Sequence, residues 1–317
     1  MADFEYISLT TKPSAKICFR FHDPISEEKP VLIVFLNGLG LPQEAWSPTI
    51  TRLKELRQSC RMPAILTYDR YGQGLTIDRD PNDAGAVDPT KAHDAVAVIQ
   101  DLRQLIVQVA SARMGITDIS HLSLVFVANS IGCALGRLFA QEYPGLVAAL
   151  LLLDSYIANT DFVSAYPDPD APGFDPSTLP RGVTPENLHT TREGMRRLFH
   201  PDVGNQEGFS RHNFPTLLPK SDRPLLEGPG GKRPFVVVIG HDFDVFAAET
   251  TRMGATEAVT NAYLNPYWHK YNEGLAHITD PDRSRGPIQA PNAGHFIQRD
   301  NPDLVAHELD TLLRKLS

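Results

Sequence analysis

The 317-residue sequence has few cysteines and no long apolar segment, and both absences narrow the class of protein. Its three cysteines, Cys18, Cys60 and Cys133, are odd in number and widely spaced, which fits neither a disulfide framework nor a zinc site. The longest apolar run, residues 146–153, is far shorter than the ~20 residues that a membrane-spanning helix needs. We therefore expect no membrane span and a core that needs neither disulfides nor metal.

Targeting signals and basic segments are missing as well. The N-terminal residues lack the basic and apolar regions of a signal peptide, and no Asn-x-Ser/Thr sequon occurs, so we expect a cytoplasmic, reducing location. The net charge is −8 and no basic block is present, which argues against nucleic acid or an anionic membrane as a partner. With 42% hydrophobic and 21% charged residues, the composition is that of a folded domain.

Apolar runs typical of buried strands alternate with stretches of helical periodicity. Strands are expected at residues 15–21, 30–36, 64–68, 122–127, 147–153 and 234–239, and helices at 91–111, 135–142 and 302–315. This alternation predicts an α/β fold with a mostly parallel central sheet flanked by helices. Residues 155–233 are rich in Pro, Gly, Asp and Arg, so we expect a cap or lid there, inserted into a core formed by residues 1–154 and 234–317.

Four short motifs carry the chemistry, and each follows an expected strand or precedes the last helix. Residues 128–132, Ala-Asn-Ser-Ile-Gly, place Ser130 in a strand-to-helix turn; a serine that only caps the helix is the alternative. Residues 37–40, Asn-Gly-Leu-Gly, form a glycine turn, and residues 69–74, Asp-Arg-Tyr-Gly-Gln-Gly, form another that we interpret as structural. His295, within Gly-His-Phe, can exchange a proton near neutral pH.

In their order along the chain, these motifs resemble those of the α/β-hydrolase superfamily, and the resemblance covers residues 15–317. Ala128 stands for the first glycine of the Gly-x-Ser-x-Gly elbow, and Asn37 for the histidine of the His-Gly-x-Gly loop. The resemblance implies an α/β-hydrolase fold with Ser130 as nucleophile and His295 as general acid/base. It also implies an oxyanion hole made by the backbone N–H groups of Leu39 and Ile131.

The triad acid has two candidates. In most of the superfamily the acid follows the strand after the cap, where Asp244 lies. In a second branch, which includes haloalkane dehalogenases and some acyl-CoA hydrolases and lactonases, it follows the strand before the cap, where Asp154 lies. We favour Asp154 for two reasons. A gap of 51 residues, a helical stretch followed by a Pro/Asp-rich one, separates Asp244 from His295 and is unusually long. The motifs around Ser130, Asp154 and His295 also resemble those of the second branch. His241, Asp242 and Asp244 are not expected to bind metal, because no further ligand cluster accompanies them.

These features predict a capped serine hydrolase that cleaves a small or medium apolar ester, lactone or thioester through an acyl-Ser130 intermediate, with no cofactor and no metal. A serine at the elbow argues against dehalogenase or epoxide hydrolase chemistry, which needs a carboxylate there. Two alternatives remain open: the same residues used for carbon–carbon bond hydrolysis or acyl transfer, and a non-catalytic receptor that binds a small molecule. A homodimer is compatible with the sequence, which does not determine the oligomeric state.

Overall fold

The computed structural model of the chain describes residues 3–25, 30–58 and 61–316, so Cys60 lies outside the described residues. Its strands form one sheet in the order β1-β2-β4-β3-β5-β6-β7-β8. The bounds are β1 Glu5–Leu9, β2 Lys12–His22, β3 Val31–Leu36, β4 Ala64–Tyr68, β5 Ser123–Asn129, β6 Val147–Leu153, β7 Phe235–Gly240 and β8 Ser284–Gln289.

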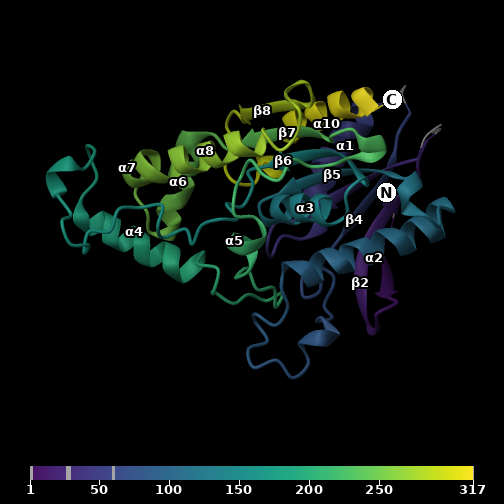
Figure 1. Cartoon of the computed structure of the whole chain (residues 1–317), viewed down its shortest axis with the longest axis horizontal. Coiled ribbons are helices and arrows are strands. Elements are labelled where there is room, and N and C mark those ends of the chain that lie inside the picture. The colour runs from purple at the N-terminus through teal and green to yellow at the C-terminus, as the bar shows by residue number, and fades with distance from the viewer. Residues whose placement is uncertain (1–2, 26–29, 59–60, 317) are drawn as a thin grey trace.

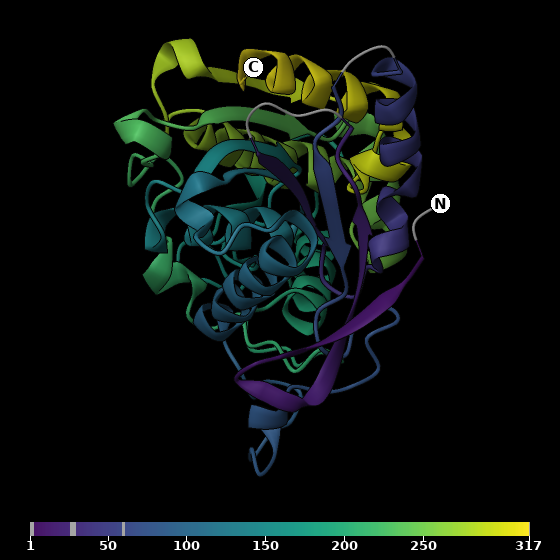
Figure 2. The same cartoon turned by 90° about the vertical axis from the view of Figure 1, so that its right-hand side faces the viewer.

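The sheet is parallel from β4 to β8, and only the pairings of β1 with β2 and of β2 with β4 are antiparallel. The central strands are continuous apolar runs because both of their faces are buried. Figure 2 shows the purple N-terminal strands strongly rotated relative to the strands behind them, as the twist of a sheet requires. The expected mostly parallel α/β architecture is confirmed.

Helices cover both faces of the sheet. The α-helices of the described residues are α1 Ser47–Leu56, α2 Ala95–Met114, α3 Ile131–Glu142, α4 Pro185–Leu198, α5 Phe214–Leu217, α6 Phe243–Thr250, α7 Glu257–Val259, α8 Asn265–Leu275, α9 Ile297–Asp300 and α10 Pro302–Leu316. Helices α1 and α10 share one apolar core with the sheet, and α2, α3 and α8 share the other. In Figure 1, α1 and α10 lie above the sheet and α2 and α3 lie below it.

The parallel strands determine where a site can form. The residues that follow β3, β5, β6 and β7 meet at the carboxyl edge of the sheet, where α/β proteins bind their ligands. The 155–233 segment contains α4 and α5 and contributes no strand to the sheet in its described residues. In Figure 1, α4 lies beyond this edge of the sheet, beside α6 and α7.

Candidate active site

Ser130 occupies a strained turn between β5 and α3. Its backbone has φ +56° and ψ −124°, a conformation that residues other than glycine rarely adopt. After this turn α3 packs closely against β3. There is no room for a side chain at position 132, because a Cβ on Gly132 would lie 2.3 Å from the carbonyl oxygen of Leu36 in β3. The Ser130 N–H also donates to Leu153 O at 3.1 Å, and Ser130 O accepts from the Tyr156 N–H at 3.0 Å. The turn is thus tied to both neighbouring strands.

His295 and Asp154 lie together at this edge of the sheet. His295 Nδ1 is 2.6 Å from Asp154 Oδ2, so the ring donates to the carboxylate and leaves Nε2 for a second partner. Ser130 and His295 line the same cavity. Among the described residues no hydrogen bond joins the Ser130 hydroxyl to the ring; such bonds are often long without substrate and shorten when it binds.

Asn129, to which sequence analysis assigned no role, connects the serine turn to the histidine loop. Its buried side chain donates from Nδ2 to Leu153 O at 3.1 Å and to His295 O at 3.0 Å. Its Oδ1 accepts from Gln298 Nε2 at 3.2 Å. One amide therefore fixes the backbone on both sides of the site. An amide directly before a predicted nucleophile, at the end of a buried strand, is the signal that could have identified it.

Asp154 directly follows β6 and is completely buried, with a positive φ of +44°. Its Oδ1 accepts from His241 Nδ1 at 2.8 Å, so two imidazoles share one carboxylate. Burial alone would raise the pKa of Asp154, but the charges of His241 and His295 and their hydrogen bonds outweigh it and lower the pKa to about 2. The carboxylate is therefore ionised at any pH near neutrality.

His241 is the second residue of the site that sequence analysis missed, and it is the other histidine that contacts Asp154. It follows β7, is 2% exposed, and stacks on the Phe246 ring with centroids 4.0 Å apart. Its Nε2 lies 3.0 Å from Asn265 Oδ1. Burial alone would lower the pKa of His241, but the Asp154 charge and the hydrogen bonds with Asp154 and Asn265 raise it above its usual value.

The alternative acid, Asp244, lies elsewhere. It is exposed in the first turn of α6, where its N–H donates to Asp242 Oδ1 at 3.1 Å. Within the described residues no hydrogen bond or ion pair joins Asp244 to His295. Asp242 caps α6 rather than facing the ring. Of the two candidate acids, the structure brings only Asp154 to His295.

The two expected oxyanion donors also face the cavity. Leu39 and Ile131 line it together with Ser130. Ile131 is the first residue of α3, where a backbone N–H has no acceptor within the helix. Within the described part of the chain, the Leu39 N–H makes no hydrogen bond. Both groups are therefore free to donate to an oxygen bound at Ser130.

Asn37 stands where the resembled His-Gly-x-Gly loop has a histidine, and it still braces the glycine loop. Its Nδ2 donates to Tyr68 O at 2.8 Å and to Gln73 Oε1 at 3.0 Å, and its Oδ1 accepts from Trp46 Nε1 at 2.8 Å. The buried indole and amide therefore satisfy one another, as buried polar groups must. The loop is fixed without a histidine.

A buried ion pair links this loop to the 155–233 segment. Glu207 pairs with Arg70 at 2.7 Å, and its Oε1 accepts from the Gly40 N–H at 2.6 Å. Arg70 in turn donates to Asn37 O at 2.9 Å and to Gly38 O at 3.0 Å. The second predicted glycine turn, residues 69–74, thus holds the first one in place, which supports its interpretation as structural.

The cavity has a volume of about 400 Å³ and mainly apolar walls. The 155–233 segment contributes Phe162, Met195 and Phe199 to these walls. The part of the chain that follows it contributes Phe246 and Trp268. Because Phe246 and Trp268 belong to α6 and α8, the cover over Ser130 extends beyond the 155–233 segment. Such a cavity suits a small or medium ligand with an apolar body.

Two other sets of side chains could react or bind metal, and the structure gives each a structural explanation: Cys133, and the group of Asp80, Asp83 and His93. Cys133 is buried in α3 with its Sγ 3.1 Å from Ala128 O, and burial raises the pKa of its thiol well above the usual value. A thiol in this state is a poor nucleophile. This agrees with Ser130 as the expected nucleophile.

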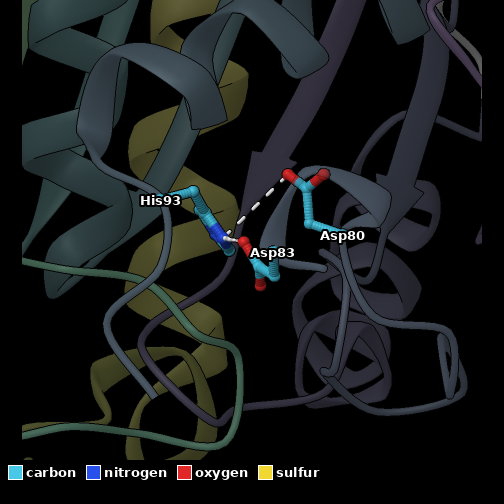
Figure 3. Close-up of side chains that lie close together, drawn as sticks. All are labelled: Asp80, Asp83 and His93. Atoms are coloured by element: carbon cyan, nitrogen blue, oxygen red, sulfur yellow. Dashed lines mark hydrogen bonds and ion pairs between the residues drawn. The ribbon is translucent and has the colours of Figure 1, made fainter. Parts of the chain in front are cut away.

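Asp80, Asp83 and His93 lie close enough to offer ligand atoms to a metal ion, as Figure 3 shows. However, His93 Nδ1 contacts Asp83 Oδ1 at 2.9 Å, and the Lys12 ammonium lies 2.5 Å from Asp80 Oδ2. Lys12 therefore already supplies the positive charge that the buried carboxylate needs. We interpret this group as an ion-pair network that anchors the loop after β4 to β2.

Comparison with known proteins gives the same fold. A family model described as the alpha/beta hydrolase family matches residues 33–308. No curated protein matches the sequence. None of the helices in the described residues is both long enough and apolar enough to cross a membrane.

Three solved structures illustrate the similarity, each aligned with 99% of this chain. A putative lipase from Acinetobacter baumannii AYE has 13% identity and a TM-score of 0.53, with 91% of its chain covered. A thermophilic esterase from Thermogutta terrifontis has 20% identity and a TM-score of 0.53, with 99% covered. A Vigna radiata epoxide hydrolase mutant has 14% identity and a TM-score of 0.57, with 99% covered. At these identities the likeness is one of fold.

Proposed function

The chain belongs to the alpha/beta hydrolase family, and from this premise we propose that it is a serine hydrolase acting on a small or medium apolar ester, lactone or thioester. The observation that carries the proposal is the 2.6 Å contact between His295 and Asp154 beside a strained Ser130 in one apolar cavity. A nucleophile, a base and an orienting acid in this relation are the elements of acyl transfer.

In the proposed first step, Ser130 Oγ attacks the acyl carbon while His295 Nε2 takes the hydroxyl proton. Asp154 holds the ring in the required tautomer and stabilises the imidazolium. The Leu39 and Ile131 N–H groups bind the oxyanion of the tetrahedral intermediate. The intermediate collapses to acyl-Ser130, and the leaving alcohol or thiol departs with the proton from His295.

In the second step, water attacks acyl-Ser130 while His295 removes one of its protons. The second tetrahedral intermediate expels Ser130, which takes the proton back, and the carboxylic acid leaves. No cofactor takes part in either step. We also propose that the 155–233 segment acts as a cap, since Glu207 ties it to the oxyanion loop and Phe162 and Phe199 cover the cavity.

A serine at the elbow supports ester chemistry rather than epoxide hydrolysis, because epoxide hydrolysis on this fold needs a carboxylate nucleophile. Carbon–carbon bond hydrolysis and acyl transfer to an alcohol would use the same three residues. Identification of the products formed from each candidate substrate separates these reactions.

The test is turnover of p-nitrophenyl butyrate by the wild type and by Ser130→Ala. We expect a burst of p-nitrophenol followed by steady turnover, and a loss of about 10⁴-fold or more in Ser130→Ala. Ser123→Ala, at the opposite end of β5, is the matched control and should retain activity. Equal activity in Ser130→Ala and the wild type would refute the proposal.

A further inference from the structure

Arg211 is a buried cation in the wall of the cavity that contains Ser130. It is 4% exposed, and its Nη atoms donate to the carbonyl oxygens of Phe199, His200 and Val203 at 3.0–3.3 Å. These carbonyls, just after α4, orient the guanidinium but carry no formal charge. Among the described residues no carboxylate pairs with Arg211, and its Nε has no acceptor. Burial, partly offset by the nearby Tyr156, lowers the pKa of Arg211.

Tyr156 places a second unpaired donor in the same cavity wall. Its backbone N–H is bonded to Ser130 O, so the residue is attached directly to the serine turn. Its side chain is 6% exposed between the rings of Phe162 and Phe214, and its hydroxyl has no partner among the described residues. Burial outweighs the nearby Arg211 and raises the pKa of Tyr156 to about 12, so the phenol is a donor at neutral pH.

Arg211 differs from the other arginines that line the cavity. Three arginines line the cavity, Arg211, Arg252 and Arg299, against one carboxylate among the described lining residues, Glu249. Arg299 pairs with Glu249 at 3.7 Å and with Asp300 at 2.8 Å, and Arg252 is exposed. Arg211 is therefore the buried arginine of this wall that no carboxylate among the described residues neutralises.

We propose that the substrate is an ester or thioester whose acyl part is apolar along its chain and ends in a carboxylate, and that Arg211 and the Tyr156 hydroxyl bind this carboxylate. The inference rests on the proposed function, because it places the reacting carbonyl at Ser130. An unpaired buried charge and an unpaired buried hydroxyl are both costly, and a carboxylate satisfies both at once. Two donor groups suit the two oxygens of a carboxylate better than the three of a phosphate.

The acyl part is chosen because it remains on Ser130 through both steps, whereas the leaving group departs after the first. A buried subsite therefore suits the part that stays. The apolar walls formed by Phe162 and Phe199 suit the methylene chain between the two ends.

The test compares p-nitrophenyl monoesters of succinate, glutarate and adipate with neutral p-nitrophenyl esters of equal chain length at pH 7.5. In the wild type we expect kcat/KM for the best carboxylate ester to exceed that of its neutral match by about 10- to 100-fold. This ratio should fall at least tenfold in Arg211→Met. Arg252→Met removes the same charge from an exposed position and should change the ratio by less than about threefold.

Tyr156→Phe keeps the ring packing and removes only the hydroxyl, so it serves if Arg211→Met does not fold. It should also lower the ratio about tenfold. A wild type that prefers the neutral esters throughout the series would overturn the inference and leave the proposed function standing.

A binding measurement separates the inference from catalysis. Glutarate, a product-like probe, should raise the Tm of the wild type and of Ser130→Ala, and should have a smaller effect on Tyr156→Phe. Failure of all esters to be hydrolysed, together with this glutarate pattern, would refute the proposed function and support the anion subsite. The absence of any glutarate effect on the wild type would count against the subsite.

Discussion

Asp154 accepts hydrogen bonds from both His241 and His295, so its charge acts on two imidazole rings of the site. Replacement by asparagine removes the charge that stabilises the His295 imidazolium and favours the wrong ring tautomer. We expect Asp154→Asn to lower kcat by up to about 10⁴-fold while the protein still folds. Steady-state kinetics with p-nitrophenyl butyrate measure this loss.

Asp244→Asn is the matched control, because the same change is made at the other candidate acid. It should leave kcat within about threefold of the wild type, since Asp244 is exposed and makes no contact with His295 among the described residues. Near-normal activity in Asp154→Asn with collapse in Asp244→Asn would reverse the assignment of the acid.

His241 is expected to be a buried imidazolium. Asn265 Nδ2 donates to Phe243 O, so Asn265 Oδ1 faces His241 Nε2 and accepts a hydrogen bond from its N–H. The other ring nitrogen donates to Asp154. Because the folded-state pKa of His241 is raised, its stabilising contribution is fully present below the unfolded pKa of about 6.5 and is lost as the pH rises through the folded value.

The free energy of unfolding of wild type minus His241→Gln should therefore be larger at pH 6 than at pH 9. Urea denaturation at both pH values measures it. His269→Gln, a change at an exposed histidine of α8, should show no such difference. A stability gap that is the same at both pH values would show that the His241 charge plays no part.

The sequence alone predicts Ser130 and His295 as site residues, because Ala128 and Gly132, two positions either side of Ser130, and Gly294, directly before His295, mark a backbone that can turn sharply. It ranks Asp154 above Asp244 only by analogy and chain spacing. It does not reveal Asn129 and His241 as parts of the site, since their partners, such as Gln298 and Asn265, are far away along the chain. Such pairings depend on how elements pack; for Asn129 the one local signal is its position directly before the predicted nucleophile, and for His241 there is none.

At the scale of elements, Gly132 sets how closely α3 approaches β3. Alanine is the better helix former by about 1 kcal/mol, yet a Cβ at position 132 would lie 2.3 Å from Leu36 O, a backbone atom that cannot move aside. We expect Gly132→Ala to destabilise the protein by several kcal/mol or to prevent folding. Chemical denaturation measures the change in the free energy of unfolding.

Gly136→Ala, one turn later in α3, is the comparison. Its nearest neighbours are the ends of the Leu36 and Phe126 side chains, at 3.0 and 3.4 Å, which can shift by small amounts. This variant should be clearly more stable than Gly132→Ala. Equal stability of the two would contradict the account of the elbow.

Strands buried on both faces are predictable because burial requires an unbroken apolar run. Strands β4 and β6 were predicted with the bounds that the structure has. The edge strands β1 and β8 were missed, since an edge strand is partly exposed and need not be apolar; β8 even contains Pro287. Helix α3 begins at Ile131 rather than at residue 135, because the helix starts directly at the elbow.

At the scale of the whole molecule, Glu207 and Arg70 couple the proposed cap to the core. Their side chains are 2% and 6% exposed. Glu207→Gln would leave a buried guanidinium without its counter-charge and loosen the Gly40 contact. We expect a loss of about 3–5 kcal/mol in the free energy of unfolding, measured by urea denaturation.

Asp280→Asn makes the same carboxylate-to-amide change in a pair whose members, Asp280 and Arg233, are 49% and 33% exposed. It should cost no more than about 1 kcal/mol. If Glu207→Gln also lowers the free energy of unfolding by no more than about 1 kcal/mol, the Glu207–Arg70 pair does not couple the proposed cap to the core.

The central claim is that Ser130 is a nucleophile activated by His295 and Asp154. Intact-mass spectrometry after treatment with a fluorophosphonate, followed by peptide sequencing, tests it most directly. We predict one covalent adduct per chain, located on Ser130, absent from Ser130→Ala and formed much more slowly in His295→Gln and Asp154→Asn. A wild-type protein that forms no adduct, or forms it on another residue, would contradict the claim.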